Sequence, residues 1–167
     1  MLKELFERRS IRRYTDRPIP EDVLTELLRA AMNAPSARNT QSWRFLVITD
    51  RNTLDDIPSL QPYTGMMKQA KAAVMVLGDR TAEAEEGYLY VNCAAAIENL
   101  LVEAVHQGLG ACWCAIAPKP ERIEGFSRYF RLDDTLLPVG IVALGWPAEE
   151  RPRTDQYDPE KVSFWKG

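Results

Sequence analysis

Arginines gather at both ends of this chain, and they are the side chains best suited to binding a small anion. They are Arg8, Arg9, Arg12, Arg13, Arg17, Arg151 and Arg153. A planar guanidinium group can hold a phosphate through two parallel hydrogen bonds. A basic cluster in a chain of net charge -3 can equally be a solvated face. The acidic balance argues against nucleic acid as a partner, because phosphate backbones attract basic surfaces.

Three segments carry more polar or glycine residues than a purely structural domain requires. They run from Arg8 to Tyr14, from Asn33 to Trp43 and from Gly108 to Trp113. Taken singly, they fit a charged turn, a serine- and asparagine-rich turn, and a glycine that caps a helix before a strand. Their order and spacing are therefore more informative than any one of them.

Side chains for self-sufficient catalysis are scarce in this sequence. It contains no glycine-rich dinucleotide fingerprint, no phosphate-binding P-loop and no nucleophile-elbow motif. The one histidine, His106, is expected at the end of a helix, as a C-terminal cation or a surface residue, and not in a catalytic triad. If the chain is an enzyme, a bound cofactor is expected to carry the reaction.

The three cysteines, Cys93, Cys112 and Cys114, indicate neither a metal site nor a disulfide framework. Their number is odd, and no Cys-x-x-Cys pair is present to start a zinc ligand set. We expect them to be buried as small apolar side chains, and we expect no metal.

Length and composition favour one domain, residues 1–167, with a C-terminal arm over about 147–167. An apolar fraction of 46% is ordinary for a globular protein. The longest apolar stretches, Ala72–Leu77 and Val139–Leu144, are far shorter than the roughly 20 residues of a membrane-spanning helix. The charged N-terminus lacks the apolar region of a signal peptide, so a cytoplasmic location without a membrane partner is expected.

Apolar periodicity and capping signals predict the elements that must position these residues. Helices are expected at Leu2–Arg9, from Pro20 to just before Pro35, from Arg51, around Tyr63–Lys71, at Glu85–Gln107, and for one or two turns from Pro120. Strands are expected at Trp43–Thr49, Ala72–Gly78, Ala111–Ile116 and Val139–Gly145. The predicted class is α+β, in about three layers, with helices around one small sheet.

Two segments suggest contact with a second copy of the chain. The long helix at 85–107 is apolar around much of its circumference and rich in alanine, so it must be buried in a core or against a partner subunit. The polar, proline-rich segment after Trp146 becomes apolar again at Val162, Phe164 and Trp165. Such an arm is expected to dock on another surface, and a second subunit is a plausible place.

Four motifs, in this order, together resemble the nitroreductase family of FMN-dependent oxidoreductases. They are Arg8-Arg9-Ser10-Ile11-Arg12, Pro35-Ser36-Ala37-Arg38-Asn39-Thr40-Gln41-Ser42-Trp43, Gly108-Leu109-Gly110-Ala111-Cys112-Trp113 and Gly145-Trp146-Pro147, before an arm that bears arginine. The resemblance extends from Leu5 to Phe164. The sequence departs from the family pattern at Ser42, where many relatives have proline, and after Trp113, where many have glycine. It is also too short for the helical insertion that covers the flavin in larger members, so a more open site is expected.

The resemblance implies a nitroreductase-like fold, with a central, mainly antiparallel sheet flanked by helices and a C-terminal arm that reaches the partner subunit. It implies a homodimer with one FMN at each subunit junction. NADH or NADPH would be the co-substrate, and a nitroaromatic or a quinone would be the acceptor in a ping-pong reaction through flavin N5. The alternative is a protein that binds or stores flavin without physiological turnover, because a shared fold does not fix function.

The resemblance also implies roles for particular residues. Arg12 would lie near the pyrimidine edge of the flavin, where a fixed cation stabilises the negative charge of the reduced ring. The residues implied to bind the phosphate or the ribityl chain are Arg8, Arg9, Ser10 and either Arg153 or Arg151. The residues implied to approach the ring from the other subunit are Pro35, Ser36, Ala37, Asn39 and Gln41. Backbone groups of Cys114 and Ala115 would face flavin N5.

Overall fold

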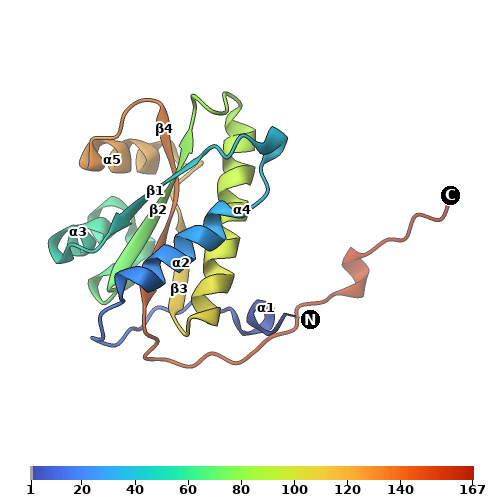
Figure 1. Cartoon of the computed structure of the whole chain (residues 1–167), viewed down its shortest axis with the longest axis horizontal. Coiled ribbons are helices and arrows are strands. Elements are labelled where there is room, and N and C mark those ends of the chain that lie inside the picture. Colours follow the sequence, from blue (N-terminus) through green and yellow to red (C-terminus); the bar gives the residue numbers. More distant parts are fainter. Residues whose placement is uncertain (1) are drawn as a thin grey trace.

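The computed structural model describes residues 2–167, and its centre is a sheet of four antiparallel strands (Figure 1). The strands are β1 (Trp43–Ile48), β2 (Ala72–Asp79), β3 (Gly110–Ala115) and β4 (Leu136–Gly145). Their order across the sheet is β1-β2-β4-β3, and each neighbouring pair runs antiparallel. The predicted α+β class with a small antiparallel sheet is confirmed.

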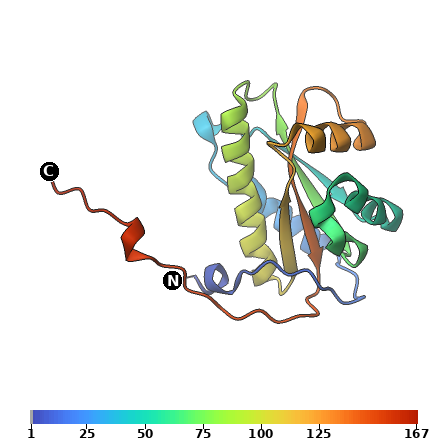
Figure 2. The ribbon, with the colours of Figure 1, turned by 180° about the vertical axis from the view of Figure 1, so that it is seen from behind.

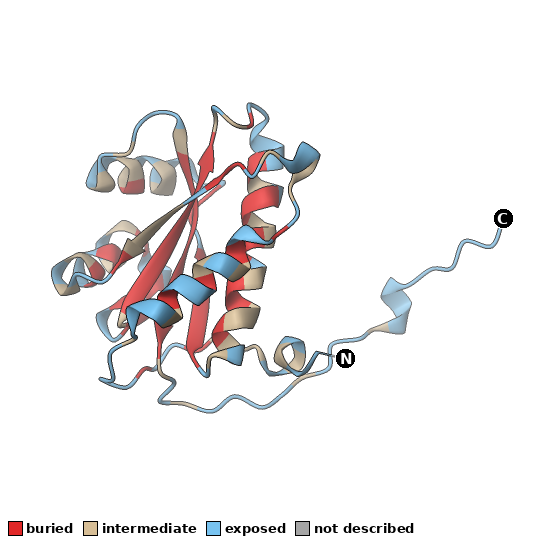
Figure 3. Ribbon diagram, in the orientation of Figure 1, coloured by how far each residue is buried: buried red, intermediate tan, exposed pale blue. Residues whose placement is uncertain are grey.

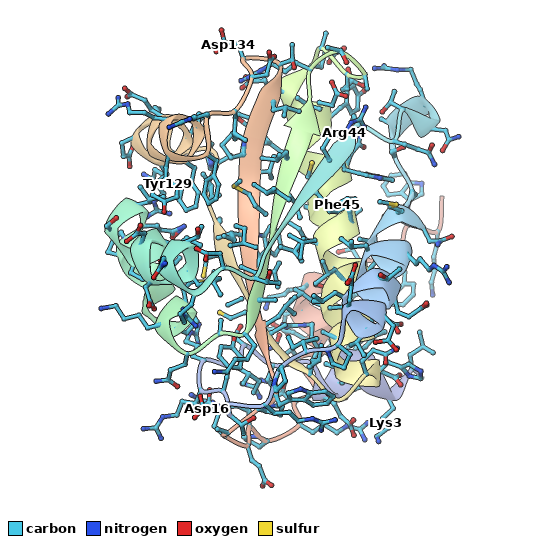
Figure 4. All side chains as sticks on the ribbon, turned by 60° about the vertical axis from the view of Figure 1, so that its left-hand side comes forward. Lys3, Asp16, Arg44, Phe45, Tyr129 and Asp134 are labelled. Carbon is cyan, nitrogen blue, oxygen red and sulfur yellow. The ribbon has the colours of Figure 1, made fainter. Side chains whose placement is uncertain are left out.

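Helices cover both faces of this sheet. The helices are α1 (Lys3–Glu7), α2 (Glu21–Met32), α3 (Arg51–Leu60), α4 (Glu86–His106) and α5 (Pro120–Phe130), with short 3-10 turns η1 (Ala37–Asn39), η2 (Pro62–Lys68) and η3 (Pro159–Lys161). Helices α2 and α4 lie on one face, and α3 and α5 lie on the other (Figure 2). On that second face, the Tyr129 hydroxyl of α5 donates a 2.8 Å hydrogen bond to the Asp56 carboxylate of α3 (Figure 4).

The central strand β2 explains why two cores form. It is buried along its whole length, and its side chains alternate between the two faces of the sheet. Val74 and Val76 pack into the core on the α4 side, whereas Met75 and Leu77 pack into the core under α3 and α5. The burial colours in Figure 3 follow this pattern, with the sheet and the inner side of α4 buried.

Two predicted elements were wrong in length. Strand β4 begins at Leu136, whereas the predicted strand began at Val139. Proline is rare inside strands, so Pro138 argued against a strand there. The strand continues through Pro138 because its pairing with β2 shifts register between Val76 and Leu77. Helix α5 has 11 residues where one or two turns were expected. Its length comes from the apolar side chains Ile123, Phe126 and Phe130, which share one helix face and pack against the second core.

Other boundaries shift by a few residues. Helix α1 is shorter than the predicted Leu2–Arg9, and Pro20 precedes α2 as its cap, where the prediction made it the first helical residue. The expected helix at Tyr63–Lys71 is the tighter turn η2, with non-helical backbone angles at Thr64. Strand β3 begins one residue earlier than predicted, at Gly110. Such differences are ordinary, because element ends are decided by caps and tertiary contacts.

Helix α4 is long and apolar enough, by length and composition alone, to cross a membrane. In the fold it is the central helix of the first core, where it packs against α2 and the sheet. Its inner side chains, including Leu89, Cys93 and Leu100, are completely buried. Core helices commonly reach the same hydropathy, and burial of this inner side accounts for the apolar residues on it.

The segment after β4 leaves the body of the subunit as an extended arm (Figures 1 and 3). The arm includes η3 and then runs to the C-terminus with its side chains exposed. Phe164 and Trp165 near its tip are 80% and 94% exposed. That this segment acts as an arm that docks on a partner subunit stays a prediction.

Candidate functional site

The N-terminal arginine motif lies across the ends of strands β3 and β4. Ser10 forms a parallel bridge with Ala111, and the Ile11 N–H donates a 2.9 Å hydrogen bond to the Ala111 carbonyl. Tyr14 forms an antiparallel bridge with Pro147. Three of the four motifs found in the sequence are thus brought together in space at one end of the sheet.

This arrangement needs glycine at two positions. A Cβ on Gly110 would lie 2.6 Å from Ile11 Cγ2, and a Cβ on Gly145 would lie 2.6 Å from the ring of Tyr14. Side chains at either position would push the N-terminal segment away from the sheet. The glycines of the third and fourth motifs therefore allow the first motif to pack closely.

Three arginines from the two chain ends border one hollow of about 540 Å³. They are Arg9, Arg151 and Arg153, and the floor includes Gly108 and Leu109 at the end of α4. Arg9 Nη1 donates a 2.5 Å hydrogen bond to the Pro152 carbonyl, which ties the two chain ends together. Three carboxylates, Glu7, Glu149 and Glu150, line the same hollow, so the guanidinium groups of Arg9 and Arg153 are the part of it suited to a phosphorylated ligand.

A carboxylate from the arm, Glu149, belongs to the same cluster. It accepts a 2.6 Å hydrogen bond from the backbone N–H of Arg12 and pairs with the Arg151 guanidinium at 2.9 Å. The first of these contacts is the main reason that the pKa of Glu149 lies below its ordinary value. Arg151 is therefore partly neutralised within the protein, whereas Arg9 and Arg153 have no ion pair among residues 2–167.

The side chains of Arg8 and Arg12 do not border this hollow. The Arg8 Nε lies 3.6 Å from a carboxylate oxygen of Glu98 on α4, so Arg8 is engaged outside the hollow. The Arg12 side chain is exposed and borders a second hollow of about 460 Å³ beside η2, together with Tyr63 and Met66. Of the predicted cofactor-binding arginines, the structure thus gathers three in one hollow and places Arg12 beside another.

Cys112 and Cys114 of β3 lie on the sheet face that packs into the second core. Both are buried, as is Cys93, which confirms the prediction for all three. The neighbouring Cys114 thiol, helped by Arg12 and Ser10, lowers the pKa of Cys112 to about 7 despite burial. Cys112 therefore interacts with the N-terminal motif as well as with the second core.

The serine- and asparagine-rich segment is held by one buried side chain, Asn92 of α4. Its Oδ1 accepts a 2.9 Å hydrogen bond from the Ala37 N–H. Its Nδ2 donates to the Ser42 hydroxyl at 2.9 Å and to the Thr40 hydroxyl at 3.3 Å. Asn92 is 1% exposed, so these bonds satisfy an amide that burial would otherwise make costly.

The backbone of this segment is strained. Arg38, Asn39 and Gln41 all have φ values between 46° and 53°, in the left-handed region that side chains other than glycine rarely adopt. The Arg38 guanidinium pairs with Glu83, whose carboxylate is almost fully buried. Clusters of strained residues that are fixed by surrounding contacts are common at ligand-binding sites. The side chains of Asn39 and Gln41 remain exposed and available.

The two groups of predicted site residues lie at opposite ends of α4. The loop is anchored at Asn92, whereas the arginine hollow is bordered by Val105 and Gly108. With a rise of 1.5 Å per residue, Asn92 and Val105 are about 20 Å apart along the helix. Figure 1 shows the same separation, with η1 near the start of α4 and the N-terminal segment near its end. One subunit therefore does not bring the loop to the arginines.

Sequence reasoning missed three residues that shape this site: Asn92, Glu83 and Glu149. Asn92 carried a detectable signal, because it is a lone amide within the apolar face of a long helix. Glu83 and Glu149 stand among other acidic residues, and nothing in their local sequence distinguishes them from a solvated surface. Their contacts depend on the tertiary structure.

Comparison with known proteins agrees with the motifs. The model described as "Nitroreductase family" matches residues 5–66 and 59–146. A protein of Methanothermobacter thermautotrophicus, provisionally named NADH dehydrogenase/NAD(P)H nitroreductase, is 37% identical over 99% of this chain and 87% of its own length. The FMN reductase [NAD(P)H] of Bacillus subtilis is 27% identical over 98% of this chain and 72% of its own length.

A solved structure has the same fold. A provisionally named nitroreductase of Desulfovibrio desulfuricans, crystallised in complex with FMN, is 30% identical, with a TM-score of 0.86 over 99% of this chain and 96% of its own. The match covers nearly all of both chains, so this chain has the fold of that structure.

Proposed function

This chain belongs to the nitroreductase family, and on that premise we propose that it works as an FMN-dependent NAD(P)H oxidoreductase. Bound FMN would supply hydride-transfer chemistry, with NADH or NADPH as the donor and a small acceptor, such as a nitroaromatic or a quinone, reduced in a separate half-reaction. The protein would bind and orient the cofactor and the two substrates. The names of the relatives support the cofactor and the nicotinamide, and the acceptor rests on the family resemblance.

The residues present fit FMN. The FMN phosphate is a dianion, and the hollow bordered by Arg9 and Arg153 offers two guanidinium groups that are free of carboxylate partners within residues 2–167. Arg8 and Ser10 flank Arg9 in the sequence. Arg151 would be a further phosphate ligand if its guanidinium group bound both Glu149 and the phosphate. We assign the phosphate to this hollow.

The observation that carries the proposal is the separation along α4. The strained loop at 35–41 and the arginine hollow lie at opposite ends of one helix, about 20 Å apart. Two copies with antiparallel α4 helices would set the loop of each subunit beside the arginines of the other. Pro35, Ser36 and Ala37 would then approach the flavin ring from the partner, with Asn39 and Gln41 as hydrogen-bonding side chains.

Exposed apolar surface supports such a homodimer. The outer face of α4 exposes Tyr88 and Val91, and the half-buried Ala95 continues this strip. The arm carries Phe164 and Trp165 away from its own subunit. Large apolar side chains in these positions are typical of surfaces that a partner covers. We infer that both surfaces are buried in the dimer.

Arg12 and the end of β3 complete the proposed flavin site. Arg12 has no carboxylate partner within residues 2–167, so its charge is available to stabilise the reduced flavin. Strand β3 begins beneath the N-terminal motif and ends at Cys114 and the exposed Ala115. Their backbone groups would face N5.

Stopped-flow absorbance tests the proposal. Rapid loss of the FMN band with NADH or NADPH under nitrogen, followed by its return when a quinone is added, is the expected result. A protein that holds FMN but bleaches only over many minutes with both nicotinamides would instead be a flavin-binding or flavin-storage protein. The storage alternative draws some support from the open hollow beside Arg12 and Tyr63, which no helical insertion covers.

A further inference from the structure

An exposed aromatic ring stands beside the proposed flavin site. Tyr63 of η2 is 71% exposed and borders the hollow that it shares with Arg12 and Arg13. Its carbonyl oxygen lies 3.6 Å from the Cys114 sulfur, so this turn is seated directly on the end of β3. An exposed aromatic ring at such a place offers a flat surface for stacking.

A cation from another element, Arg122, lies over the same ring, and it is not one of the residues that line the hollow. Arg122 near the start of α5 donates a 3.1 Å hydrogen bond from Nη1 to the Ala115 carbonyl. Its guanidinium carbon is 5.6 Å from the centroid of the Tyr63 ring. The buried Gln61 side chain donates to the same carbonyl at 2.9 Å, which fixes the strand end between η2 and α5.

The charge of Arg122 is left uncompensated. Within residues 2–167, no carboxylate lies within ion-pair distance of Arg122, Arg12 or Arg13. By contrast, Arg128 on the same helix pairs with Glu124 one turn before it. Unpaired arginines around one exposed ring are a recognisable arrangement for a planar ligand that carries a negative group.

We propose that Tyr63 and Arg122 bind the electron acceptor and select flat aromatic acceptors that carry a carboxylate or a similar anionic group. This inference rests on the proposed function, because Ala115 marks the expected side of flavin N5. Tyr63 stacks against the aromatic ring of the acceptor. The free face of the Arg122 guanidinium binds its anionic group, while Nη1 remains on the Ala115 carbonyl.

Titration calorimetry of the oxidised, FMN-loaded protein tests this assignment with two probes of nearly the same size and shape, one anionic and one neutral. The probes are para-nitrobenzoate and para-nitrobenzamide. We expect the wild-type protein to bind the benzoate roughly tenfold more tightly, which corresponds to about 1.4 kcal/mol. Arg122→Gln should abolish that preference, while Arg122→Lys, which keeps the charge, should retain much of it. Arg128→Gln is the matched control on α5 and should bind both probes as the wild type does.

The outcomes separate this inference from the proposed function. A yellow protein that NADH bleaches, yet binds both probes equally, overturns the acceptor assignment alone. An Arg122→Gln variant that loses affinity for NADH or NADPH, and not for para-nitrobenzoate, also overturns it, because the anion recognised would be a phosphate of the nicotinamide. A protein that holds no FMN overturns the proposed function before either probe is added.

Discussion

The side chain of Ile11 lies directly against the backbone of Gly110, where even a methyl group would come within 2.6 Å of Ile11 Cγ2. This contact joins the N-terminal arginine motif to the strand that follows α4. The Ile11 N–H bonds to the Ala111 carbonyl at 2.9 Å and fixes the same register. The positions of Arg9 and Arg12 therefore depend on a glycine that touches neither of them.

Gly110→Ala should consequently weaken both stability and FMN retention. Overpacking at a buried position costs about 1–3 kcal/mol, and here the displaced segment carries the arginines. Urea unfolding and an FMN titration would measure the two effects. Gly125→Ala on α5 is the control, because no atom lies within 4 Å of its added Cβ and alanine favours helix. Equal FMN affinity in the Gly110→Ala protein would contradict the proposed link between this packing and the site.

Removing the loop anchor should affect the cofactor more than the fold. Asn92→Ala leaves the Ala37 N–H and the Ser42 hydroxyl without their partner, at a cost of about 1–3 kcal/mol. Because the loop is strained, it should relax and lose its approach to the flavin. We expect a folded protein with a higher Kd for FMN. Asn52→Ala, on the exposed side of α3, should change neither quantity.

Arg12→Ala should make the two-electron reduction potential of the bound flavin more negative. A shift on the order of 30 mV would correspond to a tenfold loss in the relative stability of the reduced form. FMN affinity should change little, since the phosphate is assigned to Arg9 and Arg153. Equilibration with a reference dye measures the potential. Arg29→Ala on α2 serves as the control, and an unchanged potential in Arg12→Ala would assign Arg12 to another role.

Acid stability should depend on Asp79, at the end of β2. Its carboxylate accepts hydrogen bonds from the Thr81 hydroxyl and N–H. It also pairs with Arg44 on β1, the residue labelled in Figure 4. The Thr81 hydroxyl contributes most to a pKa that lies below the ordinary 3.8. Since the folded pKa is lowered, this stabilisation is full above about pH 4 and is lost as the pH falls below it.

Asp79→Asn should therefore lower the free energy of unfolding at pH 7 by about 1–2 kcal/mol, and the difference from the wild type should shrink below pH 4. Urea unfolding at several pH values measures it. Asp134→Asn, at the exposed tip of the loop before β4, provides the comparison and should have no effect at any pH. A difference that stayed constant from pH 7 to pH 3 would contradict this account.

The class of fold and the approximate order of its elements could be predicted from the sequence, because β2 and α4 are long apolar segments and α2 has a regular apolar stripe. The limits of α5 and β4 could not, since a proline inside a strand and an exposed helix end carry weak local signals. Tertiary packing decides both. The errors therefore fall where neighbours determine the backbone and not where local propensity does.

The sequence allowed us to predict which residues are candidates for the site, but not which of them contact one another. The arginines and the polar loop stood out in the sequence, and the structure gathers Arg9, Arg151 and Arg153 around one hollow. The distance between these arginines and the polar loop is set by α4, because the two groups lie at opposite ends of that helix. The support from Asn92 and the contact of Glu149 with Arg12 join positions far apart in the chain. No local pattern in a sequence specifies such pairs.

We propose that each flavin site takes its arginines from one subunit and its loop from the other. Hybrid dimers test it directly. One variant, Arg9→Ala with Arg153→Ala, damages the arginine hollow, and a second, Asn39→Ala, damages the loop. Each homodimer should bind FMN poorly at both of its sites. When the two variants are unfolded, mixed and refolded together, each hybrid dimer should regain one intact site, seen as FMN that stays with the protein on gel filtration. If the mixture retained no more FMN than the two variants alone, the shared site would be contradicted.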